Sequence, residues 1–200
     1  MARARKKAAR KTSTRTKRAS AGGRTRQQDA IALLKADHRQ VEELFEQFQS
    51  TRSDSRKQSL AQQVCQALKV HTQIEAEIFY PAFLEATADT DIHHEAEVEH
   101  DGAKKLIAEI EASGPDDEYY DAKMTVLSEM IKHHVNEEEK RDGMFAEARS
   151  SKMDLKGLGE RLAQRKSELM SDSGMRAGAR RQAEPQSRRR RAVGGVYVNA

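Results

Sequence analysis

The sequence has 200 residues, of which 36% are hydrophobic and 34% charged, with no tryptophan and three prolines. This composition predicts a soluble, helix-rich chain with one sizeable core plus tails. No apolar run approaches the roughly 18 residues of a membrane span, and no apolar stretch follows the basic N-terminus, so we expect neither a membrane protein nor a secretory signal. The single cysteine, Cys65, excludes an intrachain disulfide and predicts a reducing, cytoplasmic compartment.

Positive charge is concentrated at the two ends of the chain. Residues 1–26 hold eleven Lys and Arg and no acid, and residues 173–200 hold seven Arg and one Glu. The ends therefore carry +11 and +6, so in a chain of net charge +4 the middle carries −13. Both ends are predicted to be disordered tails. Through residues 1–26 and 188–191 they could bind DNA or RNA phosphates; the alternatives are solubilising tails, or tails that fold back on the acidic body.

Two amphipathic segments follow the N-terminal tail, each with apolar residues three and four apart, the spacing of a helix with one buried face. The first spans about 29–50, with a stripe of Ile31, Leu34, His38, Val41, Phe45 and Phe48. The second spans about 55–86, with a stripe of Leu60, Val64, Leu68, His71, Glu75 and Ile78. Pro81 lies late in this second segment, where we expect it to kink or end the helix.

Two further segments of this kind precede a weaker one at about 155–170. The third spans about 91–112, with a stripe of Ile92, Ala96, His100, Ala103, Ile107 and Ile110. The fourth spans about 116–148, with a stripe of Tyr120, Met124, Leu127, Ile131, His134, Glu138 and Phe145. Short connections between four such helices predict an all-α, up-down-up-down four-helix bundle over residues 27–150, with a short extra C-terminal helix over 151–172.

Histidines and glutamates interrupt these apolar stripes. Each stripe carries one histidine, namely His38, His71, His100 and His134. Glu75 and Glu138 follow two of them by four residues, on the same helix face. One such histidine alone is more often a hydrogen-bonded core residue, and one such pair is usually on the surface. Four histidines with two inward carboxylates would be a costly core without a cation, so together they predict a metal site.

The ligand types indicate which metal the site would hold. Imidazole and carboxylate without thiolate favour iron or manganese over zinc or copper. Two carboxylates that can bridge indicate two metal ions rather than one. Cys65, next to Val64, is interpreted as a small apolar filler. The sequence shows no nucleophile–base pair and no phosphate-binding loop, so any turnover would come from the metal centre.

Other histidines and one glutamate are weighed separately. His133 and Glu137 repeat the four-residue spacing, but the longer stripe favours their neighbours, so His133 is predicted to lie behind the ligands or in solvent. His93 and His94 stand near an acidic run and are predicted on the surface. Glu97 lies one turn before the third histidine and either reaches a metal or belongs to a solvated face.

Several strings resemble the hemerythrin-like HHE cation-binding family of bacterial type, in order and spacing over about 120 residues. They are LLKADHRQVEELF, VCQALKVHTQIEAEIFYPAF, EVEHDGAKKLI and LSEMIKHHVNEEE. The resemblance implies a four-helix bundle around two iron ions with an oxo or hydroxo bridge. It makes the four stripe histidines terminal ligands, and Glu75 and Glu138 the bridging carboxylates.

One position departs from the pattern of the oxygen-carrying members, which have two histidines one turn apart on the third helix. Here Ala96 stands one turn before His100. A coordination position would then be open to water, to Glu97 or to a substrate. We therefore expect a centre that binds, senses or reduces dioxygen, peroxide or nitric oxide, rather than a simple oxygen carrier. The alternative is a nucleic-acid-associated protein tethered by its basic tails, with the bundle as scaffold or sensor.

Overall fold

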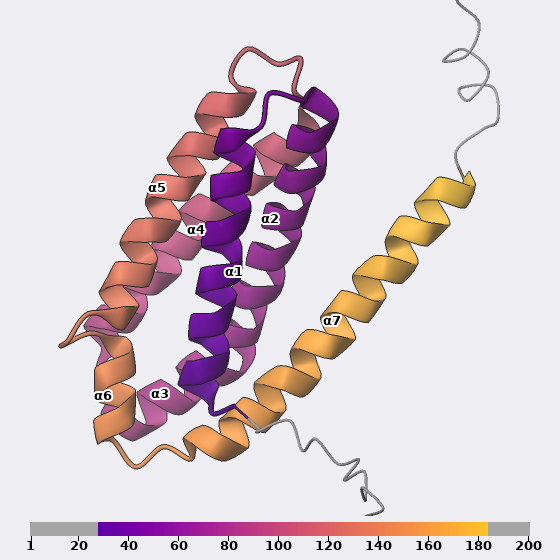
Figure 1. The fold of residues 1–200 in the computed structure, drawn as a ribbon. Coiled ribbons are helices and arrows are strands. Elements are labelled where there is room, and N and C mark those ends of the chain that lie inside the picture. The colour runs from indigo at the N-terminus through magenta and orange to yellow at the C-terminus, as the bar shows by residue number, and fades with distance from the viewer. Residues whose placement is uncertain (1–27, 184–200) are drawn as a thin grey trace, which may run out of the picture.

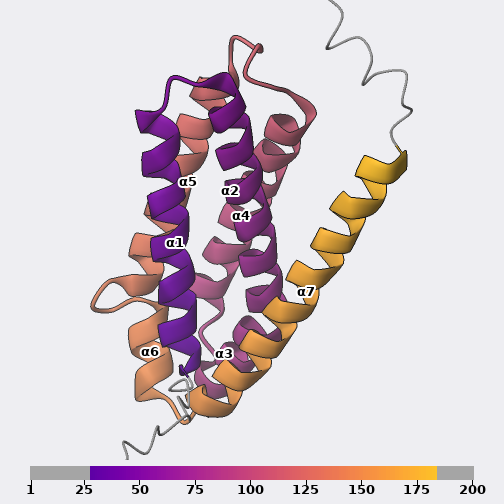
Figure 2. The ribbon, with the colours of Figure 1, turned by 45° about the vertical axis from the view of Figure 1, so that its right-hand side comes forward.

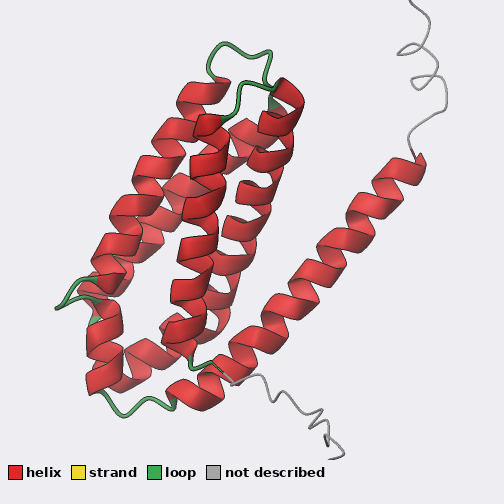
Figure 3. Cartoon of the chain, viewed as in Figure 1, coloured by secondary structure: helices red, strands yellow, loops and turns green. Residues whose placement is uncertain are grey.

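The computed structural model describes residues 28–183, and every regular element in that range is helical (Figure 3). The elements are α1 Ala30–Ser50, α2 Asp54–Ile74, the π-helix η1 Glu75–Phe79, α3 Tyr80–Thr87, α4 Thr90–Ala112, α5 Tyr120–Glu139, α6 Met144–Ser150 and α7 Leu155–Ala183. Helices α1, α2, α4 and α5 lie side by side and alternate in direction (Figure 1). The predicted all-α, up-down-up-down four-helix bundle is therefore confirmed.

Short polar side chains set where three of the bundle helices begin. Asp29 accepts a hydrogen bond of 2.7 Å from a backbone N–H in the first turn of α1. Ser53 and Asp89 cap α2 and α4 in the same way. Each cap satisfies an N–H group that would otherwise lack a partner in the helix, and contributes about 1 kcal/mol.

The second predicted segment is divided by one π-helical turn instead of a simple kink at Pro81. Within this turn the Tyr80 N–H bonds to the Glu75 carbonyl, five residues earlier. Proline has no N–H, and in an α-helix its ring would clash with the carbonyl four residues before it, so the wider turn relieves the conflict. In a regular α-helix the fifth residue is rotated by about 140°, whereas the π-turn brings Glu75 and Tyr80 towards one face.

The fourth predicted segment is also divided, so the continuous helix expected over 116–148 was wrong. Helix α5 begins at Tyr120 and ends at Glu139, and α6 begins at Met144. Gly143 makes the tight return possible, because a Cβ at this position would lie 2.2 Å from the Glu137 carbonyl oxygen. The break places α6 beyond the end of α5 and next to α3 (Figure 1).

Helix α7 is longer than expected, and it diverges from the bundle towards its C-terminal end (Figures 1 and 2). Its start packs closely on the start of α1, where a Cβ on Gly159 would lie 2.4 Å from the Gln28 carbonyl oxygen. The helix was expected to end at residue 172, but its backbone continues to Ala183. Several residues in this stretch are Ala, Arg and Gln, which favour helix, so the predicted boundary was wrong. The basic segments 1–26 and 188–191 lie outside the described residues.

The core consists of two apolar clusters stacked along the bundle. One includes Val41, Phe45, Leu68, Leu127 and Ile131. The other includes Ile31, Leu34, Ile74, Phe79 and Met144. Cys65 is fully buried in the first cluster, and burial raises the pKa of its thiol to about 12, as suits an apolar filler. Across residues 28–183, no helix combines the length and apolar character needed to cross a membrane.

Candidate metal centre

A layer of buried polar side chains separates the two apolar clusters. All six predicted site residues belong to it and are 0–4% exposed, namely His38, His71, Glu75, His100, His134 and Glu138. They come from α1, α2, the π-turn, α4 and α5, so each bundle helix contributes one histidine. Helical spacing turns these positions inward, and the four-helix arrangement makes them meet.

One pair of histidines forms what we call the first position. The Nε2 atoms of His38 and His71 lie 3.1 Å apart. Glu75 Oε2 lies 3.2 Å from His71 Nε2, and Glu138 Oε2 lies 3.4 Å from His38 Nε2. Two nitrogens and two carboxylate oxygens therefore converge at this place.

The other pair forms the second position. The Nε2 atoms of His100 and His134 lie 3.2 Å apart. The same two carboxylates reach this pair, with Glu75 Oε2 at 3.4 Å from His100 Nε2 and Glu138 Oε2 at 3.7 Å from His134 Nε2. Glu75 and Glu138 each therefore lie between the two pairs of histidines.

Outer carboxylates orient two of the imidazoles. His38 Nδ1 lies 2.8 Å from Glu139 Oε1, and His134 Nδ1 lies 2.8 Å from Glu99 Oε2. An ionised carboxylate only accepts hydrogen bonds, so each Nδ1 carries the proton and donates it. The Nε2 atom of each ring then faces the centre, and once this nitrogen carries no proton it presents the lone pair that a metal requires.

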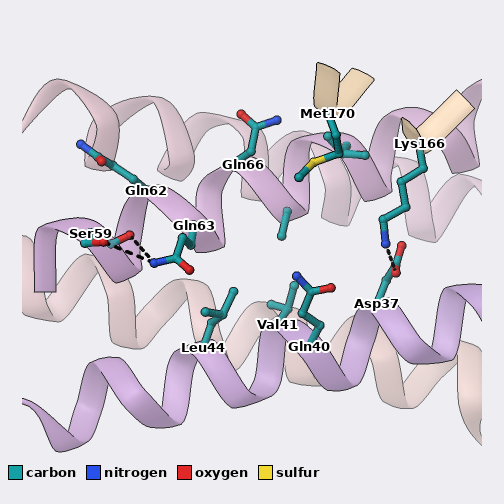
Figure 4. Close-up of a pocket in the computed structure, with 12 residues that line it drawn as sticks. Asp37, Gln40, Val41, Leu44, Ser59, Gln62, Gln63, Gln66, Lys166 and Met170 are labelled. Carbon is teal, nitrogen blue, oxygen red and sulfur yellow. Dashed lines mark hydrogen bonds and ion pairs between the residues drawn. The ribbon is translucent and has the colours of Figure 1, made fainter. Parts of the chain in front are cut away.

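His71 has a different outer contact, which leads to α7. Its Nδ1 lies 3.7 Å from Asp37 Oδ2, within ion-pair range and longer than a hydrogen bond. Asp37 also pairs with Lys166 of α7, at one end of a groove of about 470 Å³ between α1, α2 and α7 (Figure 4). Although burial raises the pKa of Asp37, His71 and Lys166 together hold it below its usual value. Helix α7 thus stabilises a charged group directly behind the first position.

Tyr80 adds an oxygen to the second position. It is 1% exposed, and its ring stacks on His100 with centroids 5.6 Å apart. Its hydroxyl lies 3.4 Å from both His100 Nε2 and Glu138 Oε1. Burial, with the nearby Glu75 and Glu138, raises the pKa of this phenol well above its usual value, so it remains a neutral donor.

The pKa values of the two central carboxyls are shifted in opposite directions. Burial and then the neighbouring Glu138 raise the pKa of Glu75 well above its usual value. Burial also acts to raise the pKa of Glu138, but His134 and His38 outweigh it and lower that pKa to about 2. Burial and then His134 lower the pKa of His100 to about 3, which keeps its ring neutral.

These donors fit a pair of metal ions. Three carboxylate oxygens have no hydrogen-bond partner among the described residues, although their side chains are buried. They are both oxygens of Glu75 and the Oε2 atom of Glu138. Unpaired buried carboxylate oxygens are strongly unfavourable, and a cation would satisfy them. Donors about 2.1 Å from one metal at right angles lie about 3 Å apart, close to the 3.1–3.7 Å observed.

The Hemerythrin HHE cation binding domain matches residues 29–146 in sequence. The chain belongs to the hemerythrin HHE cation-binding family. A crystal structure of an HHE cation binding domain-containing protein from Mycobacterium kansasii has a similar fold, with a TM-score of 0.62 at 23% identity, covering 72% of this chain and 89% of that one. Among curated proteins, none matches the sequence significantly.

Within this HHE domain, the remaining candidate side chains are sorted by exposure. The His133 side chain is 62% exposed and lies 3.3 Å from Glu99, behind the ligands as predicted. Glu97 is 61% exposed and does not join the centre. The prediction that His93 is a surface residue was wrong. Its side chain is only 12% exposed and its ring packs edge-on against Tyr80, because the π-turn brings that tyrosine inward.

The outer carboxylates of this HHE domain, Asp37, Glu99 and Glu139, were not predicted from the sequence. Each one directly adjoins a candidate ligand in sequence, in the pairs Asp37–His38, Glu99–His100 and Glu138–Glu139. An acid beside an inward residue of a helix points towards the neighbouring helix, where it can receive the Nδ1 proton of another ligand. That adjacency was a usable signal. Tyr80 had none, because its direction depends on the π-turn.

Proposed function

We propose that this HHE domain holds two bridged iron ions and uses them to bind, sense or reduce a small oxidant, namely dioxygen, hydrogen peroxide or nitric oxide. The observation that carries the proposal is the paired donor set, in which the same two carboxylates stand between two imidazole pairs. Imidazole with carboxylate suits iron. No thiolate belongs to the clusters of potential ligands found in residues 28–183.

Each group of the chain has a role in this proposal. The four histidines hold the ions, two in each position, and Glu75 and Glu138 bridge them. Such a centre supplies electrons and open coordination positions to a small oxidant. Tyr80 holds a proton at its hydroxyl beside Glu138 and can donate a hydrogen bond to a molecule in the second position. Glu139 and Glu99 keep the imidazole lone pairs directed inward.

The space beside the histidines limits the size of the molecule that can bind. A small cavity of about 10 Å³ lies against all four rings, and Val41, Leu68, Ile131 and Val135 form its apolar side. This volume is the space of about one water molecule. A molecule of two heavy atoms fits with little rearrangement, whereas a larger organic substrate does not. The apolar wall also keeps bulk water from the centre.

The experiment is a reconstitution followed by separate titrations. Protein purified without oxygen is loaded with Fe²⁺, its iron is counted, and dioxygen, peroxide and nitric oxide are each added while the absorption spectrum is recorded. We expect two irons per chain and new absorption bands with at least one of the three, and neither in Glu75→Gln. A protein that stays metal-free after loading, or a loaded protein that responds to none of them, overturns the proposal.

A second candidate function rests on the charge segregation of the sequence. We propose that residues 1–26 and 188–191 bind nucleic acid phosphates by charge, with steep salt dependence and little sequence preference. The −13 of the middle would repel a polyanion, which confines contact to the two ends. Retention of the full chain on DNA should fall steeply with salt, and should vanish when residues 1–26 are removed and the four arginines 188–191 are replaced by glutamine. Unchanged retention in that variant would reject this function.

A further inference from the structure

A second group of potential metal ligands lies at the surface where α4 and α5 meet. Glu95 and Glu99 stand one turn apart on α4, and His133 reaches towards them from α5. One ligand atom from each of the three lies within 4.8 Å of the other two. Two carboxylates and one imidazole form a donor set that divalent transition metals favour.

A small hollow lies between this surface group and the buried centre. Its walls are formed by Ile92, Glu95, Ala96, Glu99, His134, Glu137, Glu138 and Met144. Its volume of about 10 Å³ is the space of about one water molecule. The hollow passes Ala96, where a larger side chain would narrow it. Two surface ligands, Glu95 and Glu99, and two central ligands, His134 and Glu138, therefore border the same hollow, which His133 does not line.

Glu99 joins the two groups directly. One of its oxygens lies 3.3 Å from the exposed His133, and the other lies 2.8 Å from the buried His134. Its side chain is 19% exposed, between the 62% of His133 and the 4% of His134. Oxygen and nitrogen donors thus continue from the solvent to the second position without an apolar gap.

The inner end of the hollow has a group that attracts a cation. Glu138 is 2% exposed, lines the hollow, and its Oε2 has no hydrogen-bond partner among the described residues. A carboxylate oxygen in a poorly solvated place attracts a cation more strongly than one in water. Lys140 lies near Glu95 but is paired with Glu137, so its charge is already balanced at the rim of the hollow.

We propose that Glu95, Glu99 and His133 form a capture site for a divalent metal ion, Fe²⁺ in the cell, from which the ion passes through the hollow to His134 and Glu138. Delivery of the ion to the buried centre rests on the proposed function, in which iron binds at the two positions. A hydrated cation cannot cross an apolar core at acceptable cost. Here the donors can replace its water ligands in steps, which lowers that barrier.

The test measures how fast the metal-free full-length protein takes up iron. Protein and Fe²⁺ are mixed without oxygen at low ionic strength, a chelator stops uptake at successive times, and bound iron per chain is counted. The capture variant is Glu95→Gln with His133→Gln. The matched control is Glu97→Gln with His94→Gln, which makes the same chemical changes at exposed residues of α4. Surface fields that focus an ion raise its association rate by about tenfold or more.

We expect the capture variant to load about tenfold more slowly than the unaltered protein and to reach the same two irons, with the control within about twofold. Loading of the capture variant at the unaltered rate, or equal slowing of both variants, overturns the capture site. A capture variant that ends with less iron also overturns it, because those residues would then belong to the final centre. If the unaltered protein binds no iron, the proposed function fails as well, so the two failures are distinguishable.

Discussion

The two proposed metal positions share the carboxylates of Glu75 and Glu138 but differ in what lies behind them. Behind the first position the outer contacts are charged and paired. Glu139 is held by Lys35 and Arg39, and Asp37 is held by Lys166 of α7. Ion pairs that are partly removed from water resist rearrangement when both partners are present. The side chains behind the first position are thus held by ion pairs between α1 and α5 and between α1 and α7.

Behind the second position the surroundings are more open. Its outer carboxylate, Glu99, pairs with the exposed His133, and Ala96 leaves a hollow beside it. The neutral hydroxyl of Tyr80 lies 3.4 Å from His100 Nε2, whereas the side chains behind the first position are charged. From this difference we infer a division of labour, in which the first position anchors the pair of ions and the second is where ions and small molecules arrive.

Removing a shared bridge should have the largest effect, since it abolishes both positions. We expect Glu75→Gln to lose both irons, and with them the stabilisation of about 4 kcal/mol that a ligand at about 1,000 times its dissociation constant gives. The metal-free variant should be at least as stable as metal-free unaltered protein, because the amide is neutral, whereas the Glu75 carboxyl can be buried without a metal only by keeping its proton. Iron analysis and chemical unfolding with and without iron check both expectations. Retention of two irons would contradict the bridging role.

Removing one histidine should abolish iron binding at its own position and leave the other position occupied. His71→Ala is expected to lose the iron of the first position, and His134→Ala that of the second, so that each variant retains about one iron per chain. Metal analysis after identical reconstitution makes the comparison. Iron content equal to that of the unaltered protein in either variant would show that the ligand assignment is wrong.

Protons should leave the centre as iron binds. Burial and the neighbouring Glu138 raise the pKa of Glu75. Burial acts to lower the pKa of His134, but the charge of Glu138, with the hydrogen bond and charge of Glu99, outweighs it and raises that pKa. Each group therefore holds a proton more tightly in the metal-free protein than it would in water, and must lose it to become a ligand. We expect release of about one proton or more per chain in weakly buffered solution, and iron affinity that falls as the pH is lowered. Binding without proton release would contradict these protonation states.

The hydroxyl of Tyr80 should affect reactivity at the second position more than metal content. Tyr80→Phe is expected to keep two irons and to change stability by no more than about 1 kcal/mol, because its two hydrogen bonds are long. The spectral response to the reacting oxidant should slow by about tenfold, since a positioned donor is lost. Tyr119→Phe, at a residue that is 61% exposed, is the matched control. An unchanged rate of the spectral response in Tyr80→Phe would show that the tyrosine hydroxyl has no role in the reaction.

The smallest effect is expected behind the first position. Lys166→Met removes the partner of Asp37 without touching a ligand, so iron affinity at the first position should weaken by about fivefold while the second position is unchanged. Lys104→Met is the control, because Lys104 pairs with Asp101 on an exposed face of α4. The readout is competition with a chelator for each iron. Equal weakening at both positions would mean that Lys166 supports the fold as a whole rather than one position.

The centre was predictable where one helix alone determines the direction of a side chain. Each histidine lies within a stripe of period 3.6, and Glu75 and Glu138 follow their histidines by four residues, so the inward direction of all six depended on local geometry. Burial of 0–4% agrees with that reasoning.

Other features depend on contacts between helices, which periodicity does not specify. The π-turn before Pro81 changes the direction of Tyr80, and the break at Gly143 follows from close contact with the carbonyls of Glu137 and Glu138. The pairing of Asp37 with Lys166 requires the path of α7, whose apolar pattern is weak. Such features follow from tertiary packing and need coordinates to be seen.

The most direct test of the central claim is diffraction from crystals of the iron-loaded protein, recorded near the iron absorption edge. We expect two anomalous peaks, one between His38 and His71 and the other between His100 and His134. Glu75 and Glu138 should each contact both metal ions. One peak in place of two, or iron bound elsewhere on the chain, would contradict the account.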